Sequence, residues 1–240
     1  MKISVIIPTY NEEKRIRKTL EQWQPFRGTD CEIIISDNGS SDMTTKIAAP
    51  LADTVLSITE SERSSIGECR NRGARVATGD VLFFTDADVL IPHLNAVLSL
   101  VKQQFAQQKK LIAVALPSRL YPEEERVIDR FWFGVVNANM YFVNMIGLGG
   151  AGGDCQIIRR ASFEEINGYN PALYTSEDWD IFHRLTRLGK TRVWMKYPMR
   201  MSGRRIHRDG WGCLLWSWFT NWLSQCVFKR SNETPWEARR

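Results

Sequence analysis

The sequence predicts an α/β fold in which helices flank a mostly parallel central sheet. Strand-like and helix-like segments alternate through residues 3–86. The segment at residues 81–84 is apolar without interruption, which is typical of a strand buried on both faces. A β-α-β-α-β order favours parallel strands in one sheet, because each crossover helix packs back onto a face of that sheet.

Four strands and three helices account for this first part of the chain. Asn11 is expected to cap the first helix, because the acidic residues after it would lie at the positive end of the helix dipole. A turn at residues 37–39 closes the second strand, and Ser40 or Ser41 can cap the second helix. The third helix is expected at residues 64–77. The strands are expected at residues 3–7, 31–36, 54–58 and 81–84.

The second half of the chain is less regular. Residues 126–146 are apolar and aromatic with few charges, which favours a long helix, and residues 147–153 form a glycine-rich loop. A further helix is expected at residues 176–188 and a strand at residues 192–195. Because no convincing linker separates the two halves, the second half is expected to extend the same sheet.

The composition is ordinary for a soluble globular protein that can bury a core. The net charge is +5, but the basic residues form short groups, which suits a polyanionic ligand or an anionic membrane surface better than nucleic acid. The cysteines are odd in number and show no CxxC spacing, which disfavours a zinc site and favours a reducing compartment. The first apolar run is too short for a signal peptide.

A Trp-rich segment at residues 210–228 carries no charged side chain. Its apolar residues share one helical face, and basic residues flank it, Lys229 and Arg230 among them. It resembles an interfacial membrane anchor, so residues 204–230 are expected to bind an anionic membrane surface. A packed core, an oligomer interface and a true span remain alternatives, although the segment is short for a span. The apolar face comprises Trp211, Leu214, Leu215, Trp218, Trp222 and Cys226.

Two carboxylates follow the buried strand at residues 81–84. Asp86 and Asp88 emerge where that strand ends, and open α/β sheets bind their ligands at the carboxyl ends of the strands. Two hard oxygen donors there suit a divalent cation that also holds a phosphate. A turn with two solvated aspartates is the alternative.

Other acidic residues occupy comparable places. Glu12 and Asp37 follow the first two strands, and Glu177 and Asp178 begin a helix. Taken singly, each has an ordinary structural explanation: a helix start, a turn, or acidic residues recruited by a helix dipole.

Together, five motifs in order resemble the successive signatures of family 2 glycosyltransferases. They are Pro-Thr-Tyr-Asn-Glu at 8–12, Asp-Asn-Gly-Ser-Ser-Asp at 37–42, Arg-Asn-Arg-Gly-Ala at 70–74, Asp-Ala-Asp at 86–88 and Glu-Asp at 177–178. The resemblance covers about residues 3–195. It implies an A-type glycosyltransferase fold with a Rossmann-like nucleotide-binding half, and sugar transfer with inversion from a nucleotide donor, usually a UDP-sugar. The implied cofactor is Mg²⁺ or Mn²⁺.

The resemblance also implies roles for individual residues. Asp88 would ligate the metal, Asp86 would face the ribose or a metal-bound water, and His207 would be a further metal ligand. Asp178 would be the general base for the acceptor hydroxyl, with Glu177 orienting the site. The implied donor-binding residues are Pro8, Thr9, Tyr10, Glu12, Asp37, Arg70 and Asp86.

Some details depart from the family pattern or stay open. Asp37 would hold the uracil edge, but Asn38 stands where the pattern has a second aspartate. Asp180 is a rival for the role of base. Gly73 would let its helix pack close to the sheet, and Asp154 lies in a loop that looks like the acceptor-side loop of the family.

The chemistry asks for this division of labour. Negative charge builds on the diphosphate as the sugar–nucleotide bond breaks, so a metal there stabilises the transition state. A carboxylate on the opposite face of the sugar takes the hydroxyl proton. The rival readings are a nucleotidyltransferase, which releases pyrophosphate instead, and an inactive sugar-nucleotide-binding scaffold subunit.

The expected organisation follows from the resemblance. Residues 1–200 would be one catalytic domain, with residues 1–90 as the nucleotide-sugar half and residues 91–200 as the acceptor half. Residues 201–240 would associate with the inner face of the cell membrane, on the cytoplasmic side. The acceptor would be a glycan or lipid-linked, in cell-envelope polysaccharide synthesis, and the oligomeric state stays open.

Overall fold

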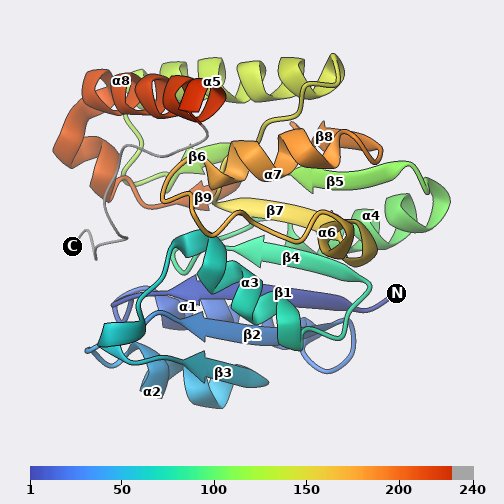
Figure 1. Ribbon diagram of the computed structural model, residues 1–240. Coiled ribbons are helices and arrows are strands. Elements are labelled where there is room, and N and C mark those ends of the chain that lie inside the picture. The colour runs from blue at the N-terminus through green and yellow to red at the C-terminus, as the bar shows by residue number, and fades with distance from the viewer. Residues whose placement is uncertain (229–240) are drawn as a thin grey trace.

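A twisted sheet lies at the centre of the structure, a computed structural model that describes the backbone of residues 1–228 and the side chains of residues 1–221. Within these residues the main sheet has seven strands in the order β3-β2-β1-β4-β7-β5-β8 (Figure 1). The strands are β1 (Ile3–Thr9), β2 (Cys31–Asp37), β3 (Thr54–Ser57), β4 (Val81–Thr85), β5 (Leu111–Ala115), β7 (Cys155–Arg159) and β8 (Lys190–Val193).

Most neighbouring strands run parallel. β1 pairs with β2 and β4, β2 with β3, and β5 with β8 in parallel, whereas β7 is antiparallel to both β4 and β5. The mostly parallel sheet predicted from the sequence is therefore confirmed. Strands from the second half extend the same sheet, as expected.

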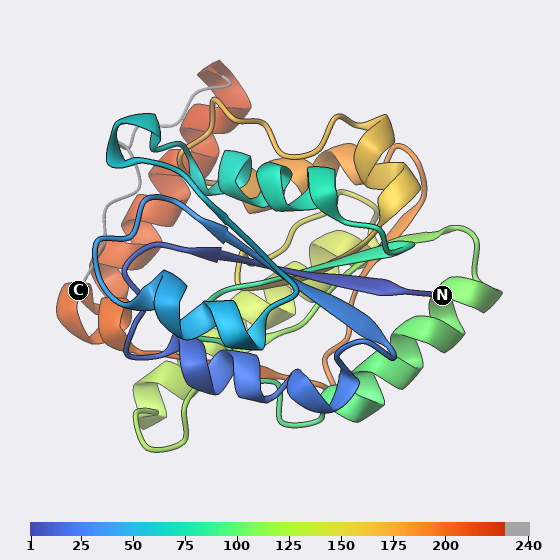
Figure 2. The same cartoon turned by 90° about the horizontal axis from the view of Figure 1, so that it is seen from below.

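Helices cover both faces of this sheet (Figure 2). One layer holds α1, α2 and α4, whose buried side chains share a core with one face of β1, β2 and β4. The other layer holds α3, α6 and α7, which pack on the opposite face together with Met140 of α5. The helices are α1 (Ile16–Glu21), α2 (Thr44–Ala48), α3 (Ile66–Val76), α4 (Leu94–Gln107), α5 (Val127–Met145), α6 (Arg160–Glu165), α7 (Glu177–Leu185) and α8 (Arg204–Phe228), with short 3-10 turns η1 (Gln24–Phe26), η2 (Ala49–Leu51) and η3 (Glu60–Glu62).

The expected helix starts near the first two strands are wrong. α1 begins at Ile16, and Asn11 lies in the left-handed region with φ 55°. The Asn11 side chain instead accepts a hydrogen bond from the Ser41 backbone N–H at 2.9 Å, and its own N–H donates to Ser40 Oγ at 2.8 Å. Neither serine caps α2, which begins at Thr44. Bonds between the two loops replace the local caps.

α5 and α8 lie side by side at one end of the molecule, next to a small sheet of β6 (Ser118–Leu120) and β9 (Met199–Met201). Gly210, with φ 76° and ψ 154°, interrupts the helical geometry of α8. Beyond this kink, Trp211 and Leu214 are buried against α5. The predicted apolar face therefore begins as a packing face, although Trp218 of that face is 37% exposed, and the side chains of Trp222 and Cys226 lie outside the described residues. Trp216 and Phe219, which are not part of that face, are exposed.

Candidate active site

The carboxyl ends of β1, β2 and β4 meet at one edge of the sheet, at the left of Figure 1. Their register is the reason: Thr9 is the partner of Asp37, and β4 lies beside β1 on its other side. The motifs that follow each strand are therefore neighbours. α8 begins at the same edge, because Arg204 contacts Asp88 there.

Asp37 is fully buried and holds this edge together. Its Oδ1 accepts hydrogen bonds from the hydroxyls of Thr9 and Ser40, and its Oδ2 accepts from the Gly39 and Ser40 N–H groups and from the Ser57 hydroxyl. Five donors occupy the two carboxylate oxygens. A contact with uracil, as predicted from the sequence, would have to displace one of these donors.

The rest of the first motif lines the same loop. Pro8 and Thr9 are buried at the end of β1. Tyr10 is 7% exposed, and the guanidinium of Arg63 lies 4.2 Å from the centre of its ring. The loop therefore holds an aromatic ring stacked with a cation beside the strand ends.

Arg70 of α3 joins three parts of the predicted site. Its Nη1 donates to Glu177 Oε1 at 2.9 Å, and its Nη2 donates to Asp86 Oδ1 at 2.9 Å and to the Gly153 carbonyl at 2.8 Å. The side chain is 1% exposed. Burial opposes its charge, but Asp86 and Glu177 keep the pKa of Arg70 above its ordinary value. The strand end, the glycine-rich loop and α7 are thus fixed by one guanidinium.

Carboxylates crowd the end of β4. The Asp86 N–H donates to the Asp154 carbonyl at 3.2 Å, which brings the glycine-rich loop next to the two strand-end aspartates. Burial raises the pKa of Asp86 and of Asp88. Burial and the charges of both aspartates raise the pKa of Asp154 to about 7. A cation among these groups would favour their ionised forms.

The donor set fits a divalent cation held jointly with a substrate. Within residues 1–228, no three His, Cys, Asp or Glu side chains converge to hold a metal by themselves. Mg²⁺ sites commonly use one or two carboxylates and leave the other positions to phosphate and water. Asp88 and Asp86 supply carboxylates of that kind at a strand end.

Arg204 and His207, both on α8, contact different acidic residues. Arg204 Nη2 lies 3.0 Å from Glu12 Oε1 and 3.2 Å from Asp88 Oδ2. His207 Nε2 lies 3.1 Å from Asp129 Oδ2, on α5. The structure thus places an arginine, and not the histidine, against the predicted metal ligand.

Asp178 and Asp180 differ in their partners. Asp180 pairs with Arg184 one turn along α7, with Oδ2 2.7 Å from Nε. Asp178 accepts only the Trp179 N–H among the bonds described, and its Oδ2 lies beside Gly153. Burial and the neighbouring Glu177 raise the pKa of Asp178 well above its usual range. A carboxylate with a raised pKa, and with an oxygen that accepts none of the hydrogen bonds described, is suited to take up a proton.

Sequence reasoning missed three residues at this site. The sequence placed Asp154 in the acceptor-side loop but gave it no role of its own, and it gave Arg204 no role beyond being one of several basic residues before the Trp-rich segment. The Tyr121 hydroxyl donates a hydrogen bond to the Asp88 backbone carbonyl at 2.5 Å. None had a local signal, because each comes from a segment that the fold alone brings to the end of β4.

The chain resembles known proteins in sequence. The profile of the family described as "Glycosyl transferase family 2" matches residues 4–167. The uncharacterized glycosyltransferase YfnE of Bacillus subtilis (strain 168) is 40% identical over 93 residues, which cover 38% of this chain and 24% of that protein. The chain thus spans about a quarter of this curated relative.

Solved structures share the fold. The mannosyltransferase PcManGT from Pyrobaculum calidifontis, in complex with GDP-Man and Mn²⁺, matches with a TM-score of 0.70 at 19% identity, over 98% of this chain and 66% of that one. Residues 1–349 of Staphylococcus aureus TarS, in complex with UDP-GlcNAc, match with a TM-score of 0.61 at 19% identity, over 82% and 58%. The fold predicted from the sequence is confirmed by these neighbours.

Proposed function

Because the chain belongs to glycosyl transferase family 2, we propose that it transfers a sugar, with inversion, from a UDP-sugar to an acceptor hydroxyl. One observation carries the proposal. Arg70 donates through Nη2 to Asp86 at the end of β4 and through Nη1 to Glu177, the residue next to the proposed base Asp178. The proposed donor side, at Asp86, and the proposed acceptor side, at Glu177 and Asp178, thus lie on either side of the buried Arg70 guanidinium.

The diphosphate of the donor is proposed to lie at Asp86 and Asp88. Mg²⁺ or Mn²⁺ held there would neutralise the charge that develops on the leaving diphosphate. The crowding of Asp86, Asp88 and Asp154, each with a raised pKa, supports a cation at this place. The Mn²⁺ in the PcManGT complex is consistent with it.

The nucleoside is proposed to lie along the loops that follow β1 and β2. Pro8, Thr9 and Tyr10 line this edge, and Asp37 shapes it through the loop that it holds. UDP is the proposed nucleotide because of the motif order, and the UDP-GlcNAc bound by TarS supports it. Glu12 lies at the same edge of the sheet, where it pairs with Arg204.

Asp178 is proposed to remove the proton of the acceptor hydroxyl while Arg70 keeps Glu177 in place. The proton moves from the hydroxyl oxygen to a carboxylate oxygen of Asp178 as that hydroxyl oxygen attacks the sugar. One displacement of this kind inverts the anomeric centre and needs no covalent enzyme intermediate.

The variant Asp178→Asn tests the base. It should bind UDP with Mn²⁺ as the unmodified chain does, but lose transfer by at least about a hundredfold, because an amide cannot accept the proton. UDP release with a pool of acceptors measures turnover, and calorimetry measures binding. Asp180→Asn is the matched control and should keep most of the activity. Equal activity of Asp178→Asn and the unmodified chain would exclude Asp178 as the base.

The acceptor is proposed to be lipid-linked or a glycan of the cell envelope, and the chain to act at the inner face of the cell membrane. Support comes from Trp216 and Phe219 of α8, which are 69% and 51% exposed. The predicted contacts of Lys229 and Arg230 lie outside the described residues. Residues 1–228 contain no helix with the length and hydropathy needed to cross a bilayer. Residues 1–200 remain the proposed catalytic domain.

A further inference from the structure

An exposed apolar stripe runs along the outer side of α5. Its five residues lie within one face of the helix, and each is 45% to 59% exposed. They are Ile128, Phe131, Val135, Phe142 and Met145. The opposite side of α5 is buried and includes Phe133, Asn137 and Met140. These side chains are about half exposed, and an exposed apolar patch of this kind marks an interaction site.

The exposed charge that α5 itself carries is basic. Asp129 is the acidic residue of α5, and it is 1% exposed and bonded to Trp211 Nε1 at 2.7 Å and to His207. The exposed charge on α5 is Arg130, whose Nε lies 3.1 Å from Oε2 of Glu125, a side chain that is 2% exposed. The stripe is therefore apolar and has no exposed carboxylate of α5 beside it, although Glu123 is exposed just before the helix begins.

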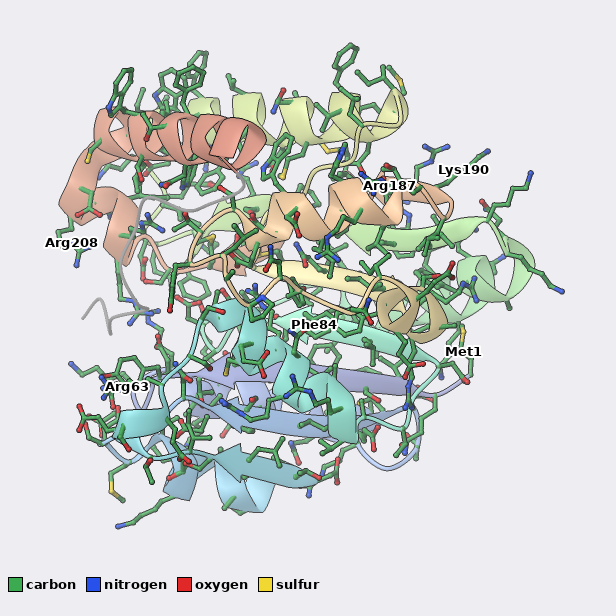
Figure 3. The ribbon with its side chains drawn as sticks, viewed as in Figure 1. Met1, Arg63, Phe84, Arg187, Lys190 and Arg208 are labelled. Atoms are coloured by element: carbon green, nitrogen blue, oxygen red, sulfur yellow. The ribbon has the colours of Figure 1, made fainter. Side chains whose placement is uncertain are left out.

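A groove opens between the last turns of α5 and β8. Two adjoining hollows of about 210 and 360 Å³ share Asn144, Met145 and Arg192 as lining residues. Lys190 lines the larger hollow and lies at the α7–β8 turn near one end of α5, where Figure 3 labels it beside Arg187. Neither Lys190 nor Arg192 forms an ion pair within the described side chains.

The groove also contains buried polar atoms without partners. Asn144 is 3% exposed and Thr191 is 2% exposed, yet Asn144 Oδ1 and Thr191 Oγ1 have no hydrogen-bond partner. Both residues line the groove. Buried polar atoms are nearly always satisfied. The Thr191 hydroxyl could donate to an acceptor such as a phosphate oxygen, whereas Asn144 Oδ1 can only accept from a donor.

We propose that the α5 stripe and this groove form a docking surface for an anionic phospholipid bilayer. The stripe enters the boundary between headgroups and acyl chains, while Lys190 and Arg192 bind a headgroup phosphate. Lys190 and Arg192 at the end of an apolar stripe match such a bilayer better than they match a second copy of this chain, which carries the same two cations at the same place. The proposal extends membrane binding beyond α8 and does not rest on the sugar-transfer reaction.

Vesicle flotation of the full chain tests the apolar part. The unmodified chain should float with vesicles of phosphatidylcholine containing phosphatidylglycerol. The double variant Phe131→Ser/Phe142→Ser should bind at least about tenfold more weakly, because two rings no longer enter the bilayer. Met43→Ser/Val76→Ser is the matched control, since Met43 and Val76 are 48% and 43% exposed on other elements.

The same assay tests the groove. Lys190→Glu/Arg192→Glu should lower binding to anionic vesicles by roughly thirtyfold or more and leave binding to pure phosphatidylcholine unchanged. Lys46→Glu/Arg17→Glu makes the same charge change on α2 and α1 and should bind as the unmodified chain does.

Three results would overturn the proposal. The first is absence of vesicle binding by the unmodified chain, and the second is equal loss in the test and control variants. The third is a dimer of the unmodified chain that Phe131→Ser/Phe142→Ser turns into a monomer, which would identify the stripe as a contact between copies. Unchanged melting temperature and UDP binding in each variant show that the fold is kept.

Discussion

Arg70 shows how much of the site depends on a single side chain. It is almost wholly buried and has carboxylate partners on two elements, Asp86 and Glu177. A buried charge is costly unless it is paired and hydrogen-bonded. The guanidinium of Arg70 neutralises both carboxylates and donates a hydrogen bond to each, so the three side chains are fixed relative to one another. The sequence motif identified Arg70, but only the structure shows which carboxylates it binds.

Replacing Arg70 by methionine should destabilise the protein by about 3–5 kcal/mol, because two carboxylates would lose their buried partner. Urea unfolding measures the free energy of unfolding. Arg75→Met, five residues along the same helix, is the control: its side chain is 62% exposed, so its effect should be within about 0.5 kcal/mol. Similar values for the two variants would contradict the role given to Arg70.

At the scale of elements, α3 can lie close to the sheet because Gly73 has no side chain. A Cβ on Gly73 would lie 2.5 Å from Ile6 Cγ2 in β1. This confirms the expectation that Gly73 lets its helix approach the sheet. The close approach matters for the site, because the same helix carries Arg70.

Gly73→Ala should therefore destabilise the fold by about 1–3 kcal/mol, although alanine is the better helix former. Gly134 of α5 offers the opposite case, since a Cβ there meets nothing within 4 Å. Gly134→Ala should stabilise the protein by about 0.5–1 kcal/mol. Thermal unfolding of both variants measures the contrast, and a change of the same sign in both would refute the packing argument.

At the scale of the whole molecule, Glu32 ties the start of the sheet to the turn before β4. Its carboxylate accepts from Ser4 Oγ, from the Thr78 N–H at 2.7 Å and from Lys2 Nζ at 3.1 Å. Burial alone would raise the pKa of Glu32, but these hydrogen bonds lower it to about 2. The ionised form is therefore the one that stabilises the folded state.

The pH dependence follows from the sign of that shift. The folded-state pKa lies below the unfolded value, so the contribution of Glu32 is fully present above about pH 4.5 and is lost as the pH falls toward 2. It amounts to roughly 3 kcal/mol at most. Glu32→Gln should lower stability at pH 7 and flatten its decline below pH 4.5. Parallel stability–pH curves for the two proteins would show that Glu32 does not contribute.

The assembly of the active site also gives a whole-molecule prediction. UDP with Mn²⁺ should raise the melting temperature of the unmodified chain, because a ligand that binds only the folded state stabilises it. Asp88→Ala should abolish the shift that depends on metal. A shift of the same size in the variant, or one that needs no metal, would contradict the proposed cation site.

The sequence by itself determined the parallel α/β core and the motifs at its strand ends. Buried apolar runs, each followed by a polar motif, are local signals, and β1, β2 and β4 follow from them. Asn11 shows the limit of such signals. It looks like a helix cap, but its hydrogen bonds go to Ser40 and Ser41, far along the chain.

Only the tertiary structure decided which groups meet at the end of β4. The sequence named His207 as a further metal ligand, whereas the structure places Arg204 against Asp88 and His207 against Asp129. It likewise placed Trp211 on an apolar face and left a membrane surface and a packed core as alternatives, and the structure buries that ring against α5. Which side of a helix is buried depends on the element that packs against it, and that choice has no local signal in the sequence.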